Sequence, residues 1–108
     1  MAVTVDHELD ELKREFLDEA LEKVDEMQSV LAAGKCDSAS LDRLAYIAHQ
    51  LKGSGGSYGY QRISDHATEL EKAIESSAGR DDHELDEEIH THVKNLRSEI
   101  EGGLKELR

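Results

Sequence analysis

Hydrophobic residues recur at steps of three and four along most of the chain, and polar residues fill the positions between them. This spacing places the hydrophobic side chains on one face of an α-helix. Four such stretches are separated by short segments rich in glycine, serine and aspartate. Four amphipathic helices with short connections predict an all-α fold, an antiparallel up-down four-helix bundle. The expected inward-facing residues are Leu9, Leu12, Phe16, Ala20, Val24, Met27 and Leu31; Leu41, Leu44, Ala48 and Leu51, with Ile47 at an edge; Ile63, Ala67, Leu70 and Ile74; and Leu85, Ile89, Val93, Leu96, Ile100 and Leu107.

Capping residues and glycines mark the expected helix boundaries. The first helix is the longest, so its N-terminal turns should extend beyond the bundle. The chain has 108 residues, no proline and no internal repeat, which predicts a single bundle domain over residues 1–108. We expect helix starts at Asp6 and at one of Asp37, Ser38 and Ser40, and helix ends at Gly34 and Gly79.

The chain is strongly acidic, with a formal net charge of −12. This charge argues against nucleic acid and anionic membranes as partners, because both bind basic surfaces. No hydrophobic run approaches the roughly 20 residues of a membrane span, and no signal peptide is visible. Cys36 is the single cysteine and cannot form an internal disulfide, which favours a reducing compartment. We therefore expect a soluble, cytoplasmic monomer.

The segment HQLKGSGGSYGYQ, residues 49–61, places four glycines in an otherwise helical pattern. Each glycine in a helix interior costs about 1 kcal/mol relative to alanine. His49 lies about 120° around the helix from the inward-facing line, so we expect its side chain to be exposed. Lys52 follows one turn later on the same flank, and Gly53 and Gly56 leave this side without side chains. The pattern predicts a histidine that a large partner can reach; a frayed helix end is the alternative.

The position of the turn between the second and third helices predicts a partner for this histidine. If the turn falls at Tyr58–Gly59–Tyr60, residues equally far before and after Tyr60 lie opposite each other, and His49 and Glu71 are both eleven residues away. A carboxylate that accepts a hydrogen bond from Nδ1–H fixes the tautomer and leaves Nε2 as the outward nucleophile. A turn shifted by one residue would separate the pair. The two tyrosines should pack across the end of the bundle.

The stretch His49-Gln50-Leu51-Lys52-Gly53-Ser54, followed by Gly59, resembles the core pattern of the histidine phosphotransfer (HPt) family of bacterial two-component signalling. That pattern is a histidine, a variable residue, an apolar residue, Lys-Gly and a small residue, with a later glycine. The specific resemblance runs from about Leu44 to Ile74, and the flanking helices agree in length and phase.

The resemblance implies that His49 is phosphorylated and exchanges its phosphoryl group with an aspartate of a response-regulator receiver domain. A sensor histidine kinase would be the other partner of this phosphorelay. Lys52 would offset the negative charge of the phosphate. Glu71 would complete the phosphorylation site. The surface that docks the receiver would comprise Gln50, Gly53, Ser54, Gly56 and Arg43.

Glu71 departs from many stand-alone members of the family, which have glutamine there, and is similar to the first domain of chemotaxis-type histidine kinases. A free-standing shuttle and a domain cut from such a kinase, phosphorylated by its own kinase domain, both remain open. In either case the chain resembles a phosphohistidine carrier and not an enzyme, since its glycine-rich stretch follows a helix and does not form an ATP-binding loop. No carboxylates are placed to hold Mg²⁺ beside His49, so the resemblance implies that the receiver supplies this ion. We expect no cofactor or metal in this domain.

Two hypotheses from other functional classes also apply. A non-phosphorylated adaptor bundle would bind its partners even without His49. His83 and His90, seven residues apart on one face, could hold zinc or nickel, although a spacing of two helical turns stretches the geometry. His66 and His92 are interpreted as residues at the edge of the core.

Overall fold

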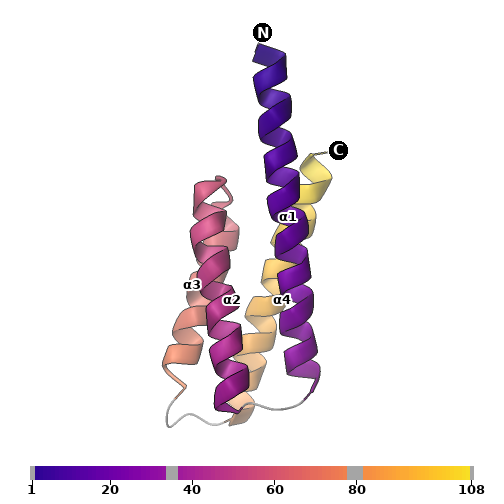
Figure 1. Ribbon diagram of the computed structural model, residues 1–108. Coiled ribbons are helices and arrows are strands. Elements are labelled where there is room, and N and C mark those ends of the chain that lie inside the picture. Colours follow the sequence, from indigo (N-terminus) through magenta and orange to yellow (C-terminus); the bar gives the residue numbers. More distant parts are fainter. Residues whose placement is uncertain (1, 34–36, 78–81, 108) are drawn as a thin grey trace.

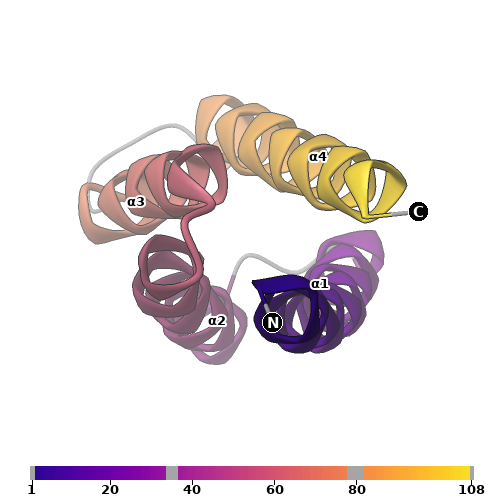
Figure 2. The ribbon, with the colours of Figure 1, turned by 90° about the horizontal axis from the view of Figure 1, so that it is seen from above.

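The computed structural model describes residues 2–33, 37–77 and 82–107, and the side chains of residues 8–33, 37–77 and 83–107. The described residues form four helices: α1 (Ala2–Ala32), α2 (Ser38–Ser57), α3 (Gln61–Glu75) and α4 (Asp82–Glu106). Successive helices run in opposite directions (Figure 1). Seen from above, each helix lies between two neighbours around a common centre (Figure 2). The prediction of an all-α, antiparallel four-helix bundle is confirmed.

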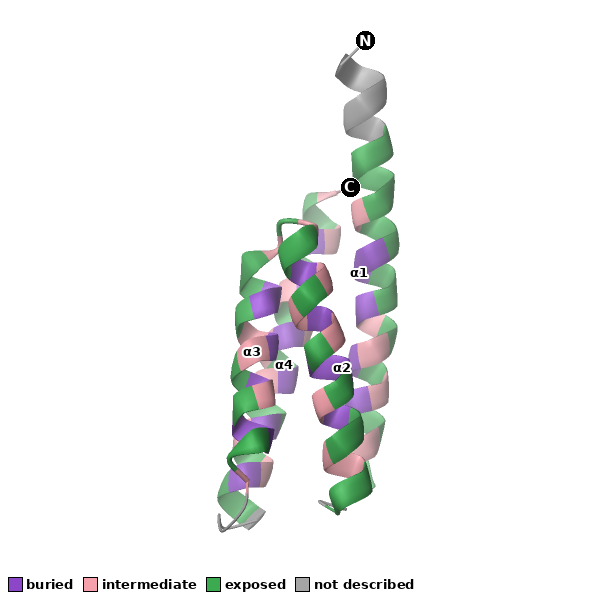
Figure 3. Cartoon of the chain, turned by 60° about the vertical axis from the view of Figure 1, so that its left-hand side comes forward, coloured by how far each residue is buried: buried purple, intermediate pink, exposed green. Residues whose placement is uncertain are grey.

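The inward face of every helix contributes to one hydrophobic core (Figure 3). Most of the predicted inward-facing residues are buried in it. Leu17 and Ile47 are fully buried as well, although the pattern placed Ile47 at an edge and did not single out Leu17. Leu41 and Leu107 are only partly buried. The buried core residues are Phe16, Leu17, Ala20, Val24, Met27, Leu31, Leu44, Ile47, Ala48, Leu51, Ile63, Ala67, Leu70, Ile74, Leu85, Ile89, Val93, Leu96 and Ile100.

The N-terminal part of α1 extends past the other helices (Figure 1). Leu9 and Leu12 are 45% and 49% exposed, and burial begins at Phe16. The prediction that these two leucines face the core is therefore wrong, whereas the predicted extension of the first helix beyond the bundle is confirmed. The reason is length, because α1 has 31 residues whereas its two neighbours, α2 and α4, have 20 and 25. Beyond the ends of its neighbours, a leucine has no helix to pack against.

Only one of the two predicted helix starts agrees with the structure. Asp37 caps α2, and its side chain accepts a hydrogen bond from the backbone N–H of Ser40 at 2.8 Å. Helix α1 begins at Ala2, so the predicted start at Asp6 is wrong. Extending an existing helix is much easier than starting one, and the residues before Asp6 include no proline or glycine that would stop the extension.

The predicted helix ends at Gly34 and Gly79 lie outside the described residues. Helices α1 and α3 end before them, at Ala32 and Glu75. Across the part of the chain that is described, none of the helices combines the length and hydrophobicity needed to cross a membrane.

A tight turn joins α2 to α3 and is anchored on α1. Gly59 has a φ angle of +83°, which residues with a side chain rarely adopt. The backbone N–H of Tyr60 donates a hydrogen bond to the carbonyl oxygen of Gly55 at 2.7 Å. The rings of Tyr58 and Tyr60 stack on Phe16, with distances of 5.0 and 5.9 Å between ring centroids. The predicted packing of both tyrosines at the end of the bundle is confirmed.

Gly55 allows α2 and α3 to approach each other closely. A Cβ atom at this position would lie 3.1 Å from the backbone nitrogen of Ser64 and 3.3 Å from the carbonyl oxygen of Tyr60. Backbone atoms cannot turn aside as the end of a flexible side chain can. A larger residue would therefore push the two helices apart, so the close packing of α2 against α3 depends on this glycine.

The substitution Gly55→Ala is expected to lower the free energy of unfolding by about 1–3 kcal/mol, the usual cost of overpacking. Gly102→Ala is the matched control, because a Cβ on this helical glycine meets nothing within 4 Å. The control should raise the free energy of unfolding by up to about 1 kcal/mol through helix propensity. Chemical denaturation followed by circular dichroism measures both, and equal effects would contradict a dependence on close approach.

Candidate functional site

His49 lies on the exposed face of α2 and is held by a residue of α3. Its side chain is 70% exposed. Its Nδ1 atom lies 3.0 Å from Oε2 of Glu71, which is hydrogen-bond distance. Because an ionised carboxylate only accepts hydrogen bonds, Nδ1 carries the hydrogen and the lone pair of the neutral ring is on Nε2. The pairing of these two residues across the α2–α3 turn, predicted from their positions in the sequence, is confirmed.

Glu71 also contacts Lys52. The Nζ atom of Lys52 lies 3.5 Å from Oε1, the carboxylate oxygen that does not face the imidazole. The side chain of Glu71 is 17% exposed, whereas that of Lys52 is 44% exposed. One largely buried carboxylate thus orients the imidazole with one oxygen and holds a cation beside it with the other. This arrangement suits a ring that becomes positively charged next to a bound anion.

Positions 53 and 56, on the exposed side of α2 in the turns after His49, carry no side chains. A Cβ on Gly53 would meet nothing within 4 Å, and a Cβ on Gly56 would meet only the hydroxyl oxygen of Ser64, at 3.9 Å. Neither glycine is therefore required by packing inside the described bundle. Ser54, which follows Gly53, is half-buried against α1 and does not cover this side. The structure thus brings an exposed imidazole and an open stretch of helix together.

Ser64 supports the site and was missed by the sequence analysis. Its side chain is buried, and its hydroxyl donates a hydrogen bond to the backbone carbonyl of Lys52 at 2.9 Å. This bond ties α3 to the turn of α2 that carries Lys52. The symmetry about Tyr60 could have found it, because Gly56 and Ser64 are both four residues from that tyrosine. The signal in the sequence is a small polar residue that lies opposite a glycine across the α2–α3 turn.

Arg43 and Gln50 lie on the side of α2 that faces α1, away from Lys52 and Glu71. Both carboxylate oxygens of Glu26 accept hydrogen bonds from the Arg43 guanidinium, one from Nε and one from Nη2 at 2.9 Å. These bonds lower the pKa of the Glu26 carboxyl from its ordinary value, so the pair is ionised at neutral pH. The Nε2 atom of Gln50 donates to the hydroxyl of Tyr46 at 3.0 Å. Two of the residues predicted to form a docking surface, Arg43 and Gln50, thus lie on the side of α2 that faces α1.

Two exposed histidines of α4 form separate contacts. The Nε2 atom of His83 lies 3.3 Å from a carboxylate oxygen of Glu87, and that of His90 lies 3.6 Å from one of Asp86. Within residues 8–33, 37–77 and 83–107, no group of three or more His, Cys, Asp or Glu side chains could hold a metal ion. The hypothesis of a metal site at His83 and His90 therefore gains no support from the structure.

The two histidines at the edge of the core are partly buried, as the sequence predicted. They are His66 in α3 and His92 in α4. The Nδ1 atom of His92 is buried without a hydrogen-bond partner among the described residues, and its Nε2 atom lies 3.9 Å from Glu88. His92 thus has a packing role in α4. Cys36 lies outside the described residues.

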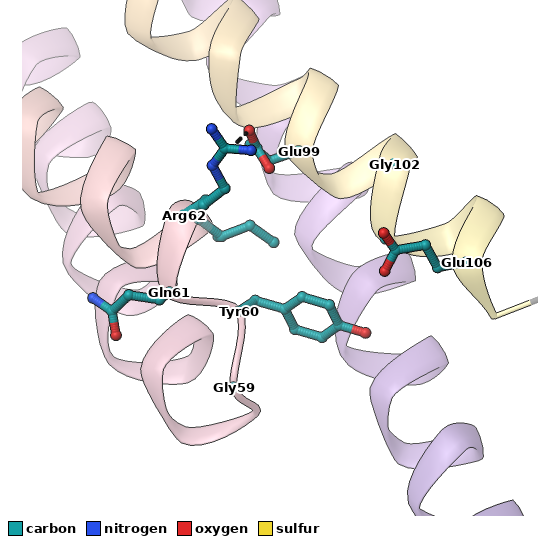
Figure 4. Close-up of a pocket in the computed structure, with 9 residues that line it drawn as sticks. Gly59, Tyr60, Gln61, Arg62, Glu99, Gly102 and Glu106 are labelled. Atoms are coloured by element: carbon teal, nitrogen blue, oxygen red, sulfur yellow. Dashed lines mark ion pairs between the residues drawn. The ribbon is translucent and has the colours of Figure 1, made fainter.

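A separate hollow of about 340 Å³ lies between the start of α3 and the last turns of α4 (Figure 4). Tyr60 and Arg62 line one side of it, and Glu99 and Glu106 line the other. The Nε atom of Arg62 is 3.7 Å from a carboxylate oxygen of Glu99. Burial, with a smaller effect of Glu106, raises the pKa of the Tyr60 phenol. His49 does not line this hollow, which is therefore distinct from the histidine site.

The comparison with protein families identifies the family of the chain. A family model described as Hpt domain matches residues 11–103, which include all of α2 and α3 and most of α1 and α4. No curated protein and no solved structure matches the chain. The matched segment contains every residue of the site around His49.

The substitution Glu71→Leu is expected to change the tautomer of His49. With Glu71 present, the neutral ring should carry its hydrogen on Nδ1, since the carboxylate accepts from that atom. Without it, the hydrogen should shift towards Nε2. Nitrogen NMR of the imidazole at mildly alkaline pH measures the ratio of tautomers. Glu69→Leu, on the exposed side of the same helix, is the control, and an unchanged ratio in Glu71→Leu would contradict the assigned hydrogen bond.

Proposed function

The chain belongs to the Hpt domain family, and we propose that it carries a phosphoryl group on Nε2 of His49 and exchanges it with an aspartate of a response-regulator receiver domain. Family membership supports a histidine phosphotransfer role in two-component signalling. One observation carries the assignment to His49: this ring is exposed while its Nδ1 atom is bound to Glu71. The other nitrogen is thereby left as a nucleophile that faces solvent.

The exchange needs no proton transfer at His49. The lone pair of Nε2 attacks the phosphorus atom of the phosphoaspartate, a P–N bond forms, and the bond from phosphorus to the carboxyl oxygen breaks. The electron pair of that bond leaves with the aspartate as a free carboxylate. Nδ1 keeps its hydrogen, so the phosphorylated ring is cationic, and Glu71 stabilises this charge through the hydrogen bond that it already accepts. In the reverse direction the carboxylate attacks phosphorus and the P–N bond breaks.

Lys52 would stabilise the phosphoryl group. Its ammonium lies beside the imidazole and is held by Glu71 through a contact of 3.5 Å, which is long for a charge-assisted hydrogen bond. A phosphate on Nε2 offers three oxygens with a charge of about −1.5 to −2 at neutral pH and would draw the ammonium towards it. Lys52 is suited to this because an ammonium on a flexible stem can follow the phosphate as it is transferred.

The receiver would dock on α2 and α3 around His49. Gly53 and Gly56 leave room there for the loops that surround the receiver's aspartate. We assign the Mg²⁺ ion of the exchange to the receiver, because phosphoryl transfer commonly requires this ion next to the transferred group. The acidity of the chain does not prevent docking, since charges farther away than about 8 Å are largely screened at physiological salt. We expect the complex to be small and transient.

The carboxylate at position 71 supports a second version of the same function. In it, the chain is the phosphorylated domain of a longer chemotaxis-type histidine kinase and receives its phosphoryl group from that kinase's ATP-binding domain. The carrier would have no ATP site of its own in either version. The single cysteine of the chain supports the reducing cytoplasm as the compartment of the exchange.

Incubation with a phosphorylated receiver or an active sensor kinase from the same organism is expected to add the mass of one phosphoryl group to the wild-type chain. Intact-mass spectrometry measures the adduct, which should be labile in acid and absent from His49→Gln. His90→Gln is the matched control, because His90 is also an exposed helical histidine but lies on α4. An adduct that persists in His49→Gln would contradict the assignment, and a folded chain that no donor labels would favour the adaptor.

The substitution Gly53→Leu is expected to slow transfer from the receiver by at least about tenfold. A leucine that blocks docking and costs about 1.4 kcal/mol of binding free energy lowers the affinity for the receiver tenfold. It should not unfold the chain, since nothing lies within 4 Å of the added Cβ. Gly102→Leu, at an equally open helical position, is the control and should transfer normally. Transfer reactions are stopped at successive times, and the two proteins are separated by gel electrophoresis to measure the rates. A normal rate in Gly53→Leu would place the receiver elsewhere on the bundle.

A further inference from the structure

Tyr46 presents an aromatic ring on the exposed face of α2, close to His49. Its exposed fraction is 54%, the highest of the three large exposed hydrophobic residues among the described side chains. The other two lie on the part of α1 that extends past the bundle. Tyr46 precedes His49 by three residues, which corresponds to about 4.5 Å along the helix axis and about 60° around it. An exposed aromatic ring next to the nucleophile is not needed for packing the core.

Two side chains hold the ring of Tyr46 in place without burying it. Gln50 donates a hydrogen bond to its hydroxyl at 3.0 Å. The guanidinium of Arg43 lies over the ring, 5.5 Å from its centroid. Arg43 is in turn fixed by its two hydrogen bonds to Glu26 of α1. The ring therefore has a defined orientation before any partner arrives, which lowers the entropy that docking would cost.

Tyr46 and Gly53 lie on nearly the same line of α2. They are seven residues apart, about 20° around the helix and about 10.5 Å along it, with His49 between them along the axis. A partner that lies along α2 and reaches His49 therefore meets a bare backbone at one end and a fixed aromatic ring at the other. The bare backbone accepts many surfaces, whereas a ring requires a matching pocket.

We propose that Tyr46 is a specificity-determining residue that selects the receiver, and that Glu26, Arg43 and Gln50 are positioning residues for its ring. This inference rests on the proposed phosphoryl exchange. It identifies the side chain by which the domain recognises its receiver. The matching receiver presents an apolar pocket for the ring, placed beside the loops that enter over Gly53. Tyrosine and arginine are enriched among interface residues that dominate binding, and a rigid ring contributes contact area at low entropic cost.

The test is the transfer of phosphate from the receiver that labels the wild-type chain. Tyr46→Ala is expected to raise the KM for this receiver by about tenfold or more, the effect of losing a dominant interface residue. Tyr46→Phe keeps the ring and should stay within a few-fold of wild type. Labelling by phosphoramidate, a small donor that needs no docking surface, is measured alongside as the reference for an intact His49. Leu12→Ala is the control for loss of an exposed apolar side chain away from α2.

A double-substitution cycle tests the positioning residues. Glu26→Ala should raise the KM for the receiver in the wild-type background and should have no further effect in Tyr46→Ala, because it acts only through the ring. Equal effects of Glu26→Ala in both backgrounds would overturn the positioning role.

Failure of this inference can be told apart from failure of the proposed function. A wild-type KM in Tyr46→Ala overturns the specificity role, while transfer by the wild-type chain leaves the exchange at His49 standing. If neither the receiver nor phosphoramidate labels His49 in the folded wild-type chain, the proposed function fails, and the role of Tyr46 fails with it.

Discussion

The register of α2 against α3 is the constraint on which the histidine site depends. Gly55 lets the two helices approach, Gly59 turns the chain, and the N–H of Tyr60 closes the turn on the Gly55 carbonyl. Only with this register does Glu71 reach His49. A shift of one residue would rotate the carboxylate by about 100° around α3 and remove it from the ring. The chemistry of an exposed imidazole is thus fixed by packing about two to three helical turns away from it.

The same constraint explains why the pair of His49 and Glu71 could be predicted from the sequence. The connection between α2 and α3 is only a few residues long, so counting outward from Tyr60 is enough to find opposite positions. The helical phase of Leu44, Ala48 and Leu51 sufficed to predict which side of α2 is exposed. A four-helix bundle likewise followed from the hydrophobic pattern, because the pattern reports which face of each helix is buried.

Other features could not be predicted because they depend on contacts between helices that no short turn relates. The pairing of Arg43 with Glu26 depends on the register of α1 against α2, which the sequence does not fix. Consequently the sequence did not reveal that Arg43, expected at the docking surface, is bonded to Glu26 of α1. The exposure of Leu9 and Leu12 was missed for a similar reason. Periodicity identifies the apolar face of a helix but does not reveal where its neighbours end.

The exposure of His49 also bears on how long a phosphoryl group would last there. A group carried on a ring that is 70% exposed stands in water, so hydrolysis and partners reach it from the same side. The lifetime of the phosphorylated chain would then be governed by the intrinsic lability of the P–N bond and by the concentration of receivers. A phosphoryl group so placed would suit rapid passage of a signal, and any lasting record of it would have to be kept by another protein.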